Sequence, residues 1–380
     1  MDKRPTFAMI STDIRRDLLA PLRAFRELRI VHFYRKAPYN DLTAEDLADQ
    51  ALVPYASPDD LARKLADARP DIIQNVELFT ARQFPYVWAV YRYARRRGLP
   101  LVAGVHMSVP LQHKYGLGPA LLLRAALAPV LRYTRLFFYL NNGGLRNLRW
   151  MGAPQDRLVR HMYGTWGIDP DEFTPQRSGK EPNWGAGPVL LFVGRIHPEK
   201  GILDLLEAYG QVRESQPNTR LVLIGEGPLQ ADAQRSVETL GWQDKVRFLG
   251  TVKHRDLPPC FRAGTVFVSP AVHTRKWEEY VGMTNLQAMA SGLPVVSTRS
   301  GAIPEYVPET AGLLAPEKDP PAVAQAILKL LSEPDLRRGM GAAGRAYAAE
   351  HYDASKNVQQ AEAMILERVG RRLASQAPTK

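Results

Sequence analysis

The chain has 380 residues, of which 45% are hydrophobic and 23% charged, an ordinary globular composition with enough length for two domains. Its single cysteine, Cys260, excludes an intrachain disulfide and a cysteine-based metal cluster. The first residues (MDKRPTFAMIST) lack the apolar core of a secretory signal, and arginines interrupt the most apolar region, residues 116–140. We therefore expect a cytoplasmic protein without a membrane-spanning helix.

The net charge of +11 is concentrated in the first half of the chain. Residues 1–180 hold 27 Lys and Arg against 17 Asp and Glu, whereas residues 181–380 hold 23 against 22. A basic half indicates either a merely solvated basic face or an anionic partner, which would be a membrane surface, an acidic small molecule or nucleic acid.

The first half contains short apolar runs that predict the strands of an α/β domain. These runs lie at residues 7–11, 28–34, 71–75, 99–104, 136–140 and 158–162. His106 follows the fourth run, and a histidine there is either a satisfied structural residue or a functional one. The segment 91–97 (YRYARRR) favours either the exposed end of a helix or, with the arginine-containing apolar stretch 121–138, a docking site for anionic lipid.

Residues 175–188 (PQRSGKEPNWGAGP) predict an interdomain linker, because Pro and Gly are dense and no apolar period survives. We place the boundary near residue 183. The expected domains are residues 1–182 and 183–355, followed by a C-terminal helix and polar tail, residues 356–380, that packs back toward the first domain.

The second half alternates apolar runs with amphipathic segments. The runs are residues 189–193, 220–224, 246–249, 265–269 and 294–297, and the amphipathic segments are residues 202–214, 229–240 and 286–291. This alternation predicts a doubly wound α/β domain with a parallel sheet that is buried on both faces.

Three strand-to-helix connections in this half carry candidate site residues. Residues 194–201 (GRIHPEKG) place Arg195 and Lys200 between a strand end and a helix start, where parallel sheets bind anions such as a diphosphate. Residues 225–228 (GEGP) form a turn whose glycines permit close approach of a ligand. Considered alone, Arg195 and Lys200 are as readily ordinary loop charges as side chains that bind a ligand. Considered alone, the turn is more often a plain strand-to-helix connection than part of a binding site.

The third connection spans residues 277–296 (WEEYVGMTNLQAMASGLPVV). A helix that starts at Gly282 would direct the N–H groups of Met283 and Thr284 at an anion, while Glu279 accepts hydrogen bonds from hydroxyl groups. A sugar ester of a diphosphate satisfies both requirements.

Taken together, these residues resemble the retaining glycosyltransferases of family 4. The motif G-R-x4-K-G, the turn G-x-G-P and the tail A-M-A-x-G-x-P-V-V occur in the family's order, at residues 194–201, 225–228 and 288–296. The resemblance implies the GT-B fold, two Rossmann-like doubly wound domains that face each other across a cleft. Residues 167–175 resemble the family segment that leads into the linker.

The resemblance also implies roles for individual residues. Arg195 and Lys200 neutralise the donor diphosphate, Glu279 contacts hydroxyls of the transferred sugar, and His106 lies beside that sugar. The donor-binding set is completed by Gly194, Gly225, Glu226, Gly227, Gly282, Met283, Thr284 and Gln287. Gln287 replaces the family's second glutamate, which holds the ribose, and an amide is the weaker acceptor by about 1 kcal/mol.

We therefore expect a hexosyltransferase that uses a nucleotide-diphospho-sugar and a hydroxyl acceptor, a glycan, glycolipid or small molecule. Two cations and a helix N-terminus make a metal or other cofactor unnecessary. The alternatives are a nucleotide-sugar epimerase of the same fold and a degenerate protein that binds sugar nucleotides or anionic surfaces. The basic first domain adds peripheral contact with the inner face of an anionic membrane, and we expect no nucleic acid partner.

Overall fold

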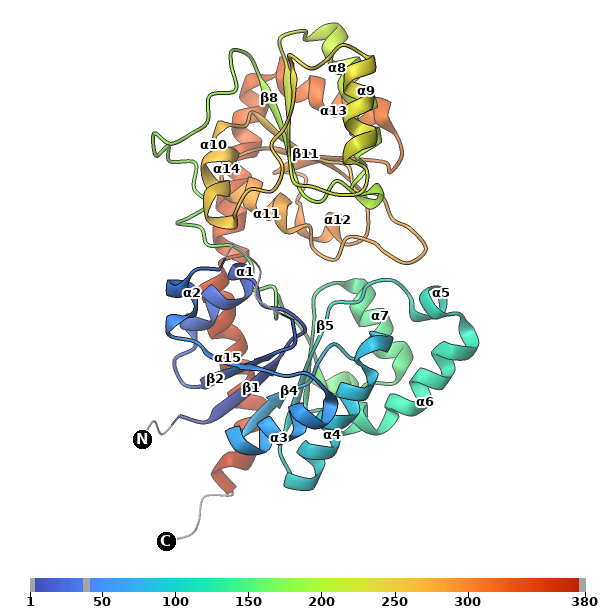
Figure 1. Ribbon diagram of the computed structural model, residues 1–380, viewed down its shortest axis with the longest axis vertical. Coiled ribbons are helices and arrows are strands. Elements are labelled where there is room, and N and C mark those ends of the chain that lie inside the picture. Colours follow the sequence, from blue (N-terminus) through green and yellow to red (C-terminus); the bar gives the residue numbers. More distant parts are fainter. Residues whose placement is uncertain (1–3, 37–41, 376–380) are drawn as a thin grey trace. The chain divides into compact units, whose positions relative to one another are not determined.

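The structure is a computed structural model that describes residues 4–36 and 42–375 (Figure 1). The chain divides into two compact units. Unit 1 comprises residues 1–167 and 354–380, and unit 2 comprises residues 168–353. No helix in the described ranges is long and apolar enough to cross a bilayer.

The boundary expected near residue 183 lies instead between residues 167 and 168, and the second unit ends at residue 353. The segment between residues 168 and 182 is fastened to unit 2. Arg345 Nη1 donates to the Phe173 carbonyl at 2.8 Å, and Arg262 forms an ion pair with Glu181 at 2.8 Å. The Pro- and Gly-rich composition therefore marks a surface segment of unit 2, because composition does not reveal these long-range contacts.

Unit 1 contains a parallel sheet with the strand order β3-β2-β1-β4-β5-β6-β7. The strands are β1 (Thr6–Ile10), β2 (Arg29–Tyr34), β3 (Ala51–Pro54), β4 (Ile72–Gln74), β5 (Leu101–Val105), β6 (Leu136–Tyr139) and β7 (Leu158–Arg160). The helices are α1 (Arg16–Leu19), α2 (Ala44–Ala48), α3 (Pro58–Ala68), α4 (Phe84–Arg97), α5 (Leu111–Tyr115), α6 (Leu117–Tyr133), α7 (Asn142–Met151) and α15 (Ala354–Ser375).

Both faces of this sheet are buried because strand residues alternate between two hydrophobic clusters. On one face Ala8, Ile73 and Ala103 pack with residues of α3, α4, α6 and α7. On the other face Phe7 and Ile72 pack with residues of α15 and the 3-10 helix η1 (Ala20–Ala24). The sheet is therefore covered by helices on both sides, as in a doubly wound domain.

The C-terminal helix α15 belongs to unit 1 and is bound there by a buried carboxylate. Glu362, only 4% exposed, accepts hydrogen bonds from the backbone N–H groups of Arg26, Glu27 and Leu28 at 2.7–3.1 Å. Asn357 Nδ2 adds a bond to the Trp166 carbonyl at 2.7 Å. The Glu362 contacts join residues more than 300 positions apart in the sequence, and the Asn357 contact joins residues 191 positions apart.

Unit 2 contains a second parallel sheet with the order β10-β9-β8-β11-β12-β13. The strands are β8 (Val189–Val193), β9 (Arg220–Ile224), β10 (Val246–Phe248), β11 (Val266–Ser269), β12 (Val295–Thr298) and β13 (Gly312–Ala315). The helices are α8 (Ile202–Ser215), α9 (Gln230–Thr239), α10 (Leu257–Ala263), α11 (Met283–Ala290), α12 (Ile303–Tyr306), α13 (Pro320–Ser332) and α14 (Pro334–His351). The predicted class, two doubly wound α/β domains, is confirmed.

Two strands have no counterpart among the predicted runs. β3 is a four-residue strand at the edge of its sheet, partly exposed, and it ends in proline. β13 is the edge strand of the other sheet and reads only GLLA. Edge strands bury less apolar surface than central ones, so their sequence pattern is too short and too weak to stand out.

Candidate functional site

The candidate residues of unit 2 lie where the strand order reverses. β8 and β11 are neighbours at the centre of the sheet, and the chain runs outward from them in opposite directions. Arg195 and Lys200 follow the carboxyl end of β8, and Glu279 lies in the connection after β11. This is the switch point at which open parallel sheets bind their ligands.

Lys200 and Glu279 meet at this point although 79 positions separate them in the sequence. Lys200 Nζ lies 2.5 Å from Glu279 Oε2, and the two side chains are only 18% and 13% exposed. The ammonium also lies 4.9 Å from the centre of the Trp277 ring. The sequence-based roles placed a cation and an acid near one ligand, and the structure brings the two charges into direct contact.

The backbone of Glu279 is held by the turn that follows β12. Ala302 N donates to the Glu279 carbonyl at 2.8 Å. Gly301 has φ of 52°, and a Cβ added there would lie 2.4 Å from the same carbonyl oxygen. Only glycine allows this left-handed conformation and this close approach together, so the turn fixes where the Glu279 carboxylate points.

Helix α11 begins beside Glu279 as the sequence predicted, with Gly282 as its N-cap at φ of 79°. No described side chain caps this end, so the first N–H groups, including those of Met283 and Thr284, are left for a ligand or water. The Cγ of Glu279 lies 3.6 Å from where a Cβ of Gly282 would stand. A carboxylate, a cation and an uncapped helix start therefore share one locality.

Arg195 is exposed, and in the described part of the chain it forms no ion pair. The positive charges of Arg195 and Lys200 nevertheless both act on His197, which lies between them in the sequence. Burial lowers the pKa of His197, and the charges of Arg195 and Lys200 lower it further. The charges of Arg195 and Lys200 thus act on the same point of the connection after β8, which also contains Glu199, in contact with His197 Nδ1.

The glycines of the turn after β9 serve loop packing. A Cβ at Gly225 would lie 2.0 Å from the Gly194 carbonyl oxygen, and one at Gly227 would lie 2.2 Å from the Ile196 carbonyl oxygen. Ile196 N also donates to the Glu226 carbonyl at 2.9 Å. The close approach that these glycines allow is to the loop that carries Arg195, so the turn shapes the site through that loop.

The side chain of Glu226 is exposed and points toward the connection after β10, where its Oε1 accepts from Thr251 N at 3.3 Å. Gln287, on α11, is 6% exposed, and its Nε2 lies 3.1 Å from Nε2 of His254. The amide donates to this nitrogen when the imidazole carries its hydrogen on Nδ1. The Gln287 Oε1 is buried without a hydrogen-bond partner among the described residues, and is thus available as an acceptor.

Sequence reasoning did not single out His254, Trp277 or Gly301. His254 follows β10 in the 3-10 helix η5 (His254–Asp256). Its position after the carboxyl end of a strand was the available signal, because those ends share one edge of a parallel sheet. Trp277 and Gly301 lie in connections whose course the sequence does not predict.

His106 follows β5 in unit 1, and both of its ring nitrogens contact acceptors. Nδ1 lies 3.1 Å from Glu77 Oε2 and Nε2 lies 3.1 Å from the Tyr163 carbonyl. Burial alone would lower the pKa of His106, but Glu77 and the Tyr163 carbonyl outweigh it and raise the pKa above its ordinary value. Both contacts favour the protonated ring, and the role of His106 beside a donor sugar stays a proposal.

The chain contains one Asp-x-Asp triplet, the type of sequence that often binds a divalent metal, at Asp169 and Asp171. Asp169 Oδ1 accepts hydrogen bonds from the backbone N–H groups of Asp171 and Glu172 at 2.9 and 3.1 Å. This carboxylate is thus used in a local turn. Over residues 4–36 and 42–375, no three His, Cys, Asp or Glu side chains are grouped as a metal site would require.

The sequence and the fold of the chain are similar to those of known proteins. Residues 176–347 match the family of glycosyl transferases group 1. The matched segment contains the cations, the acid and the helix start described above. Together with the relatives below, this match confirms the resemblance drawn from the three motifs.

Two curated relatives are similar over 71% and 49% of the chain. The GDP-mannose-dependent monoacylated alpha-(1-6)-phosphatidylinositol monomannoside mannosyltransferase of Corynebacterium glutamicum is 27% identical over 285 residues, 71% of this chain and 73% of the relative. The GDP-mannose-dependent alpha-(1-6)-phosphatidylinositol monomannoside mannosyltransferase of Mycolicibacterium smegmatis is 33% identical over 195 residues, 49% of this chain and 51% of the relative. The chain thus spans only about half of the second relative.

Solved structures confirm the GT-B fold. Anabaena Alr3699/HepE in complex with UDP matches with a TM-score of 0.78 and 16% identity, over 95% of this chain and 100% of that chain. Sucrose-phosphate synthase from Thermosynechococcus elongatus matches with a TM-score of 0.71 and 21% identity, over 98% and 100%. At these identities the comparison establishes architecture alone.

Proposed function

We propose that this glycosyltransferase moves a hexosyl group from a nucleotide-diphospho-sugar to a hydroxyl acceptor, with retention of anomeric configuration and without a metal ion. The observation that carries the proposal is the Lys200–Glu279 ion pair beside the uncapped start of α11, at the switch point of the sheet. The names of the mannosyltransferase relatives and the UDP complex of the fold neighbour support a nucleotide-sugar donor.

In the proposed reaction the bond between the anomeric carbon and the diphosphate oxygen breaks, and a bond to the acceptor oxygen forms on the same face. The acceptor proton passes to the leaving phosphate oxygen, so no separate base is required. Negative charge grows on the leaving diphosphate, where Arg195, Lys200 and the N–H groups of Met283 and Thr284 stabilise it. These fixed positive groups take the part that a divalent cation would otherwise play.

The Lys200–Glu279 contact links donor binding to sugar recognition in this scheme. When a diphosphate attracts Lys200, the Glu279 carboxylate loses its partner and becomes free to accept hydrogen bonds from sugar hydroxyls. Trp277, which lies beside the same ammonium, limits how far Lys200 can move. Gln287 Oε1 offers one acceptor to the ribose.

We also propose that the enzyme works in the cytoplasm, peripheral to the inner face of an anionic membrane. The basic composition of the first half and the lipid-linked acceptors named for the mannosyltransferase relatives support this location. His106, at the carboxyl end of β5, is the residue of unit 1 that we assign to the donor sugar.

A thermal-shift screen of nucleoside diphosphates and their sugars, beginning with GDP-mannose and UDP-glucose, tests the donor. A ligand present at about 100 times its Kd stabilises the folded chain by about 2.7 kcal/mol and raises Tm measurably. We expect one nucleotide series to do so. If no nucleoside diphosphate or nucleotide sugar shifts Tm, the proposed donor is wrong.

Turnover separates the proposal from its two alternatives. We expect the selected nucleotide sugar to release nucleoside diphosphate when a hydroxyl acceptor is present. Conversion of the donor alone into an epimer would identify an epimerase instead. Saturable donor binding without consumption, over a panel of lipid and soluble acceptors, would identify a degenerate binding protein.

A further inference from the structure

The positive charge of unit 1 comes from one uninterrupted stretch. Residues 78–155 contain 11 Lys and Arg and no Asp or Glu. The stretch includes α4, α5, α6 and α7, of which α4, α6 and α7 pack with α3 against one face of the sheet. Eight of these eleven cations therefore belong to the helices α4, α6 and α7 of a single helical layer.

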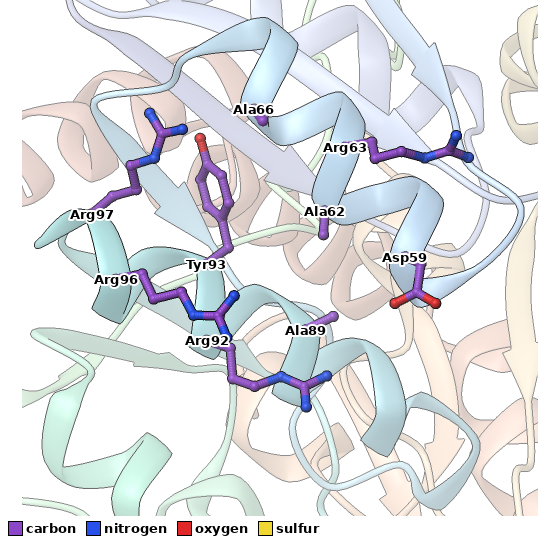
Figure 2. A pocket seen from close by; sticks show the side chains of 9 residues that line it. All are labelled: Asp59, Ala62, Arg63, Ala66, Ala89, Arg92, Tyr93, Arg96 and Arg97. Carbon is purple, nitrogen blue, oxygen red and sulfur yellow. The ribbon is translucent and has the colours of Figure 1, made fainter.

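A groove between α3 and α4 concentrates four of the arginines of this layer (Figure 2). The groove has a volume of about 420 Å³ and is lined by Arg63 from α3 and by Arg92, Arg96 and Arg97 from α4. Alanines of both helices border it, namely Ala62, Ala66 and Ala89, and their short side chains keep it open.

Few acids oppose these cations. Asp59 lines the groove, and Asp60 lies 3.3 Å from Arg63. Arg92, Arg96 and Arg97 form no ion pair with any residue that the structure describes. Tyr93 lies beneath Arg97, whose guanidinium is 5.6 Å from the ring centre. The groove therefore keeps a net positive charge that is suited to phosphate groups.

The same helical layer exposes apolar side chains next to its cations. Leu117, Leu121 and Leu122, in the first turns of α6, are 62%, 47% and 73% exposed. Leu121 borders a second hollow, of about 310 Å³, that also contains Arg124 and Arg132. Exposed leucines cost free energy in water, whereas the acyl boundary of a bilayer accepts them.

We infer that the outer face of α3, α4 and α6 is a docking surface for an anionic phospholipid bilayer. The arginines of the groove bind lipid phosphates, and the leucines of α6 enter the acyl boundary. α6 begins after β5, near the carboxyl edge that carries His106, so docking brings lipid close to that edge. The link to a lipid-borne acceptor rests on the proposed function, but the binding itself does not.

Vesicle sedimentation of the full chain tests this surface. Vesicles of equal parts phosphatidylglycerol and phosphatidylcholine are compared with phosphatidylcholine alone, at ionic strengths of about 0.1 M and about 1 M. We expect binding to the anionic vesicles only, with clear weakening at the higher salt. Equal binding to both vesicle types, or none to either, overturns the proposal.

Paired variants assign the binding to the proposed residues. Arg92→Gln with Arg96→Gln is expected to lower the partition coefficient on the order of tenfold or more. Its control is Arg177→Gln with Arg247→Gln, which removes the same charge from exposed positions of unit 2. Wild-type partitioning of the groove variant, with an unchanged Tm, contradicts the assignment.

The leucines are tested in the same way. Leu121→Asp with Leu122→Asp is expected to abolish most binding at either salt, whereas Leu203→Asp with Leu240→Asp, at exposed leucines of unit 2, leaves it intact.

A soluble inositol phosphate that displaces the wild type completely from vesicles would show that the groove serves a free phosphate. Turnover with a water-soluble acceptor, measured without vesicles, is expected to be normal in all four variants, so failure here is distinct from failure of the proposed transfer.

Discussion

At the scale of single residues, the site depends on charges placed where water is partly excluded. Lys200 and Glu279 are each less than one-fifth exposed, so their mutual attraction is screened less than that of a surface pair. The same environment strengthens the attraction between Lys200 and a bound diphosphate. A cation in this position stabilises a leaving group more than a solvated lysine would.

Removal of one cation is the first prediction. We expect Arg195→Ala and Lys200→Ala each to lower turnover on the order of 100-fold or more, by analogy with the loss of one transition-state donor. Steady-state kinetics with the selected donor measure the effect, and Arg247→Ala, at an exposed arginine, is the charge-matched control. Near-normal turnover in both site variants would remove these residues from the mechanism.

Gln287 gives the second prediction. A glutamate in its place would be a charge-assisted acceptor for ribose hydroxyls, and would accept a hydrogen bond from an Nε2–H of His254. We expect Gln287→Glu to tighten nucleoside diphosphate binding by about tenfold, or about 1.4 kcal/mol, in calorimetry. Gln243→Glu, an exposed position, is the control. Unchanged or weaker affinity would show that position 287 does not reach the nucleotide.

The third prediction concerns pH and His106. A histidine whose pKa is raised on folding stabilises the folded state below its unfolded pKa, and this contribution disappears as the pH rises through the folded pKa. We therefore expect Glu77→Gln to lower Tm more at about pH 5.5 than at about pH 8, and to lower the pKa of His106 in an NMR titration. An effect that is equal at the two pH values would mean that the imidazole is not held as a cation.

At the scale of elements, central strands and the start of α11 were predictable, whereas the contacts between connections were not. The runs at 189–193 and 220–224 are β8 and β9 with identical bounds, because each contains four or five consecutive apolar residues and ends at a glycine. The motif spacing also located the helix start at Gly282. The pairing of Lys200 with Glu279 and the packing of Gly225 on Gly194 depend on tertiary structure, which no local pattern encodes.

The turn that holds Glu279 gives the fourth prediction. Gly301→Ala would place a methyl group 2.4 Å from the Glu279 carbonyl oxygen and force the connection to move. Gly241→Ala has a similar positive φ, 65°, but nothing within 4 Å, so it shares the backbone cost without the clash. We expect Gly241→Ala to lose about 1–2 kcal/mol of stability, Gly301→Ala to lose more because of the clash, and only Gly301→Ala to lose turnover, by tenfold or more. Equal turnover in the two variants would show that this turn does not position Glu279.

At the scale of the whole molecule, each unit has its own sheet and its own core, and the chain returns to unit 1 through α15. Hydrophobic alternation predicted two α/β domains, but it could not predict that residues 168–182 belong to unit 2, since ion pairs and hydrogen bonds decide that. The charge is also divided unevenly over the molecule. Unit 2 carries the donor-site residues of the second half, while most of the net charge lies in residues 1–180, most of which belong to unit 1.

The most direct test of the proposed transfer is an NMR time course of the selected nucleotide-diphospho-hexose with a hydroxyl acceptor and excess chelator. We predict that the anomeric signal of the donor is replaced by that of a glycoside with the same anomeric configuration, together with free nucleoside diphosphate, and that Lys200→Ala slows this change on the order of 100-fold. A product of inverted configuration, an epimerised donor, or a reaction that occurs only after a divalent metal is added would contradict it.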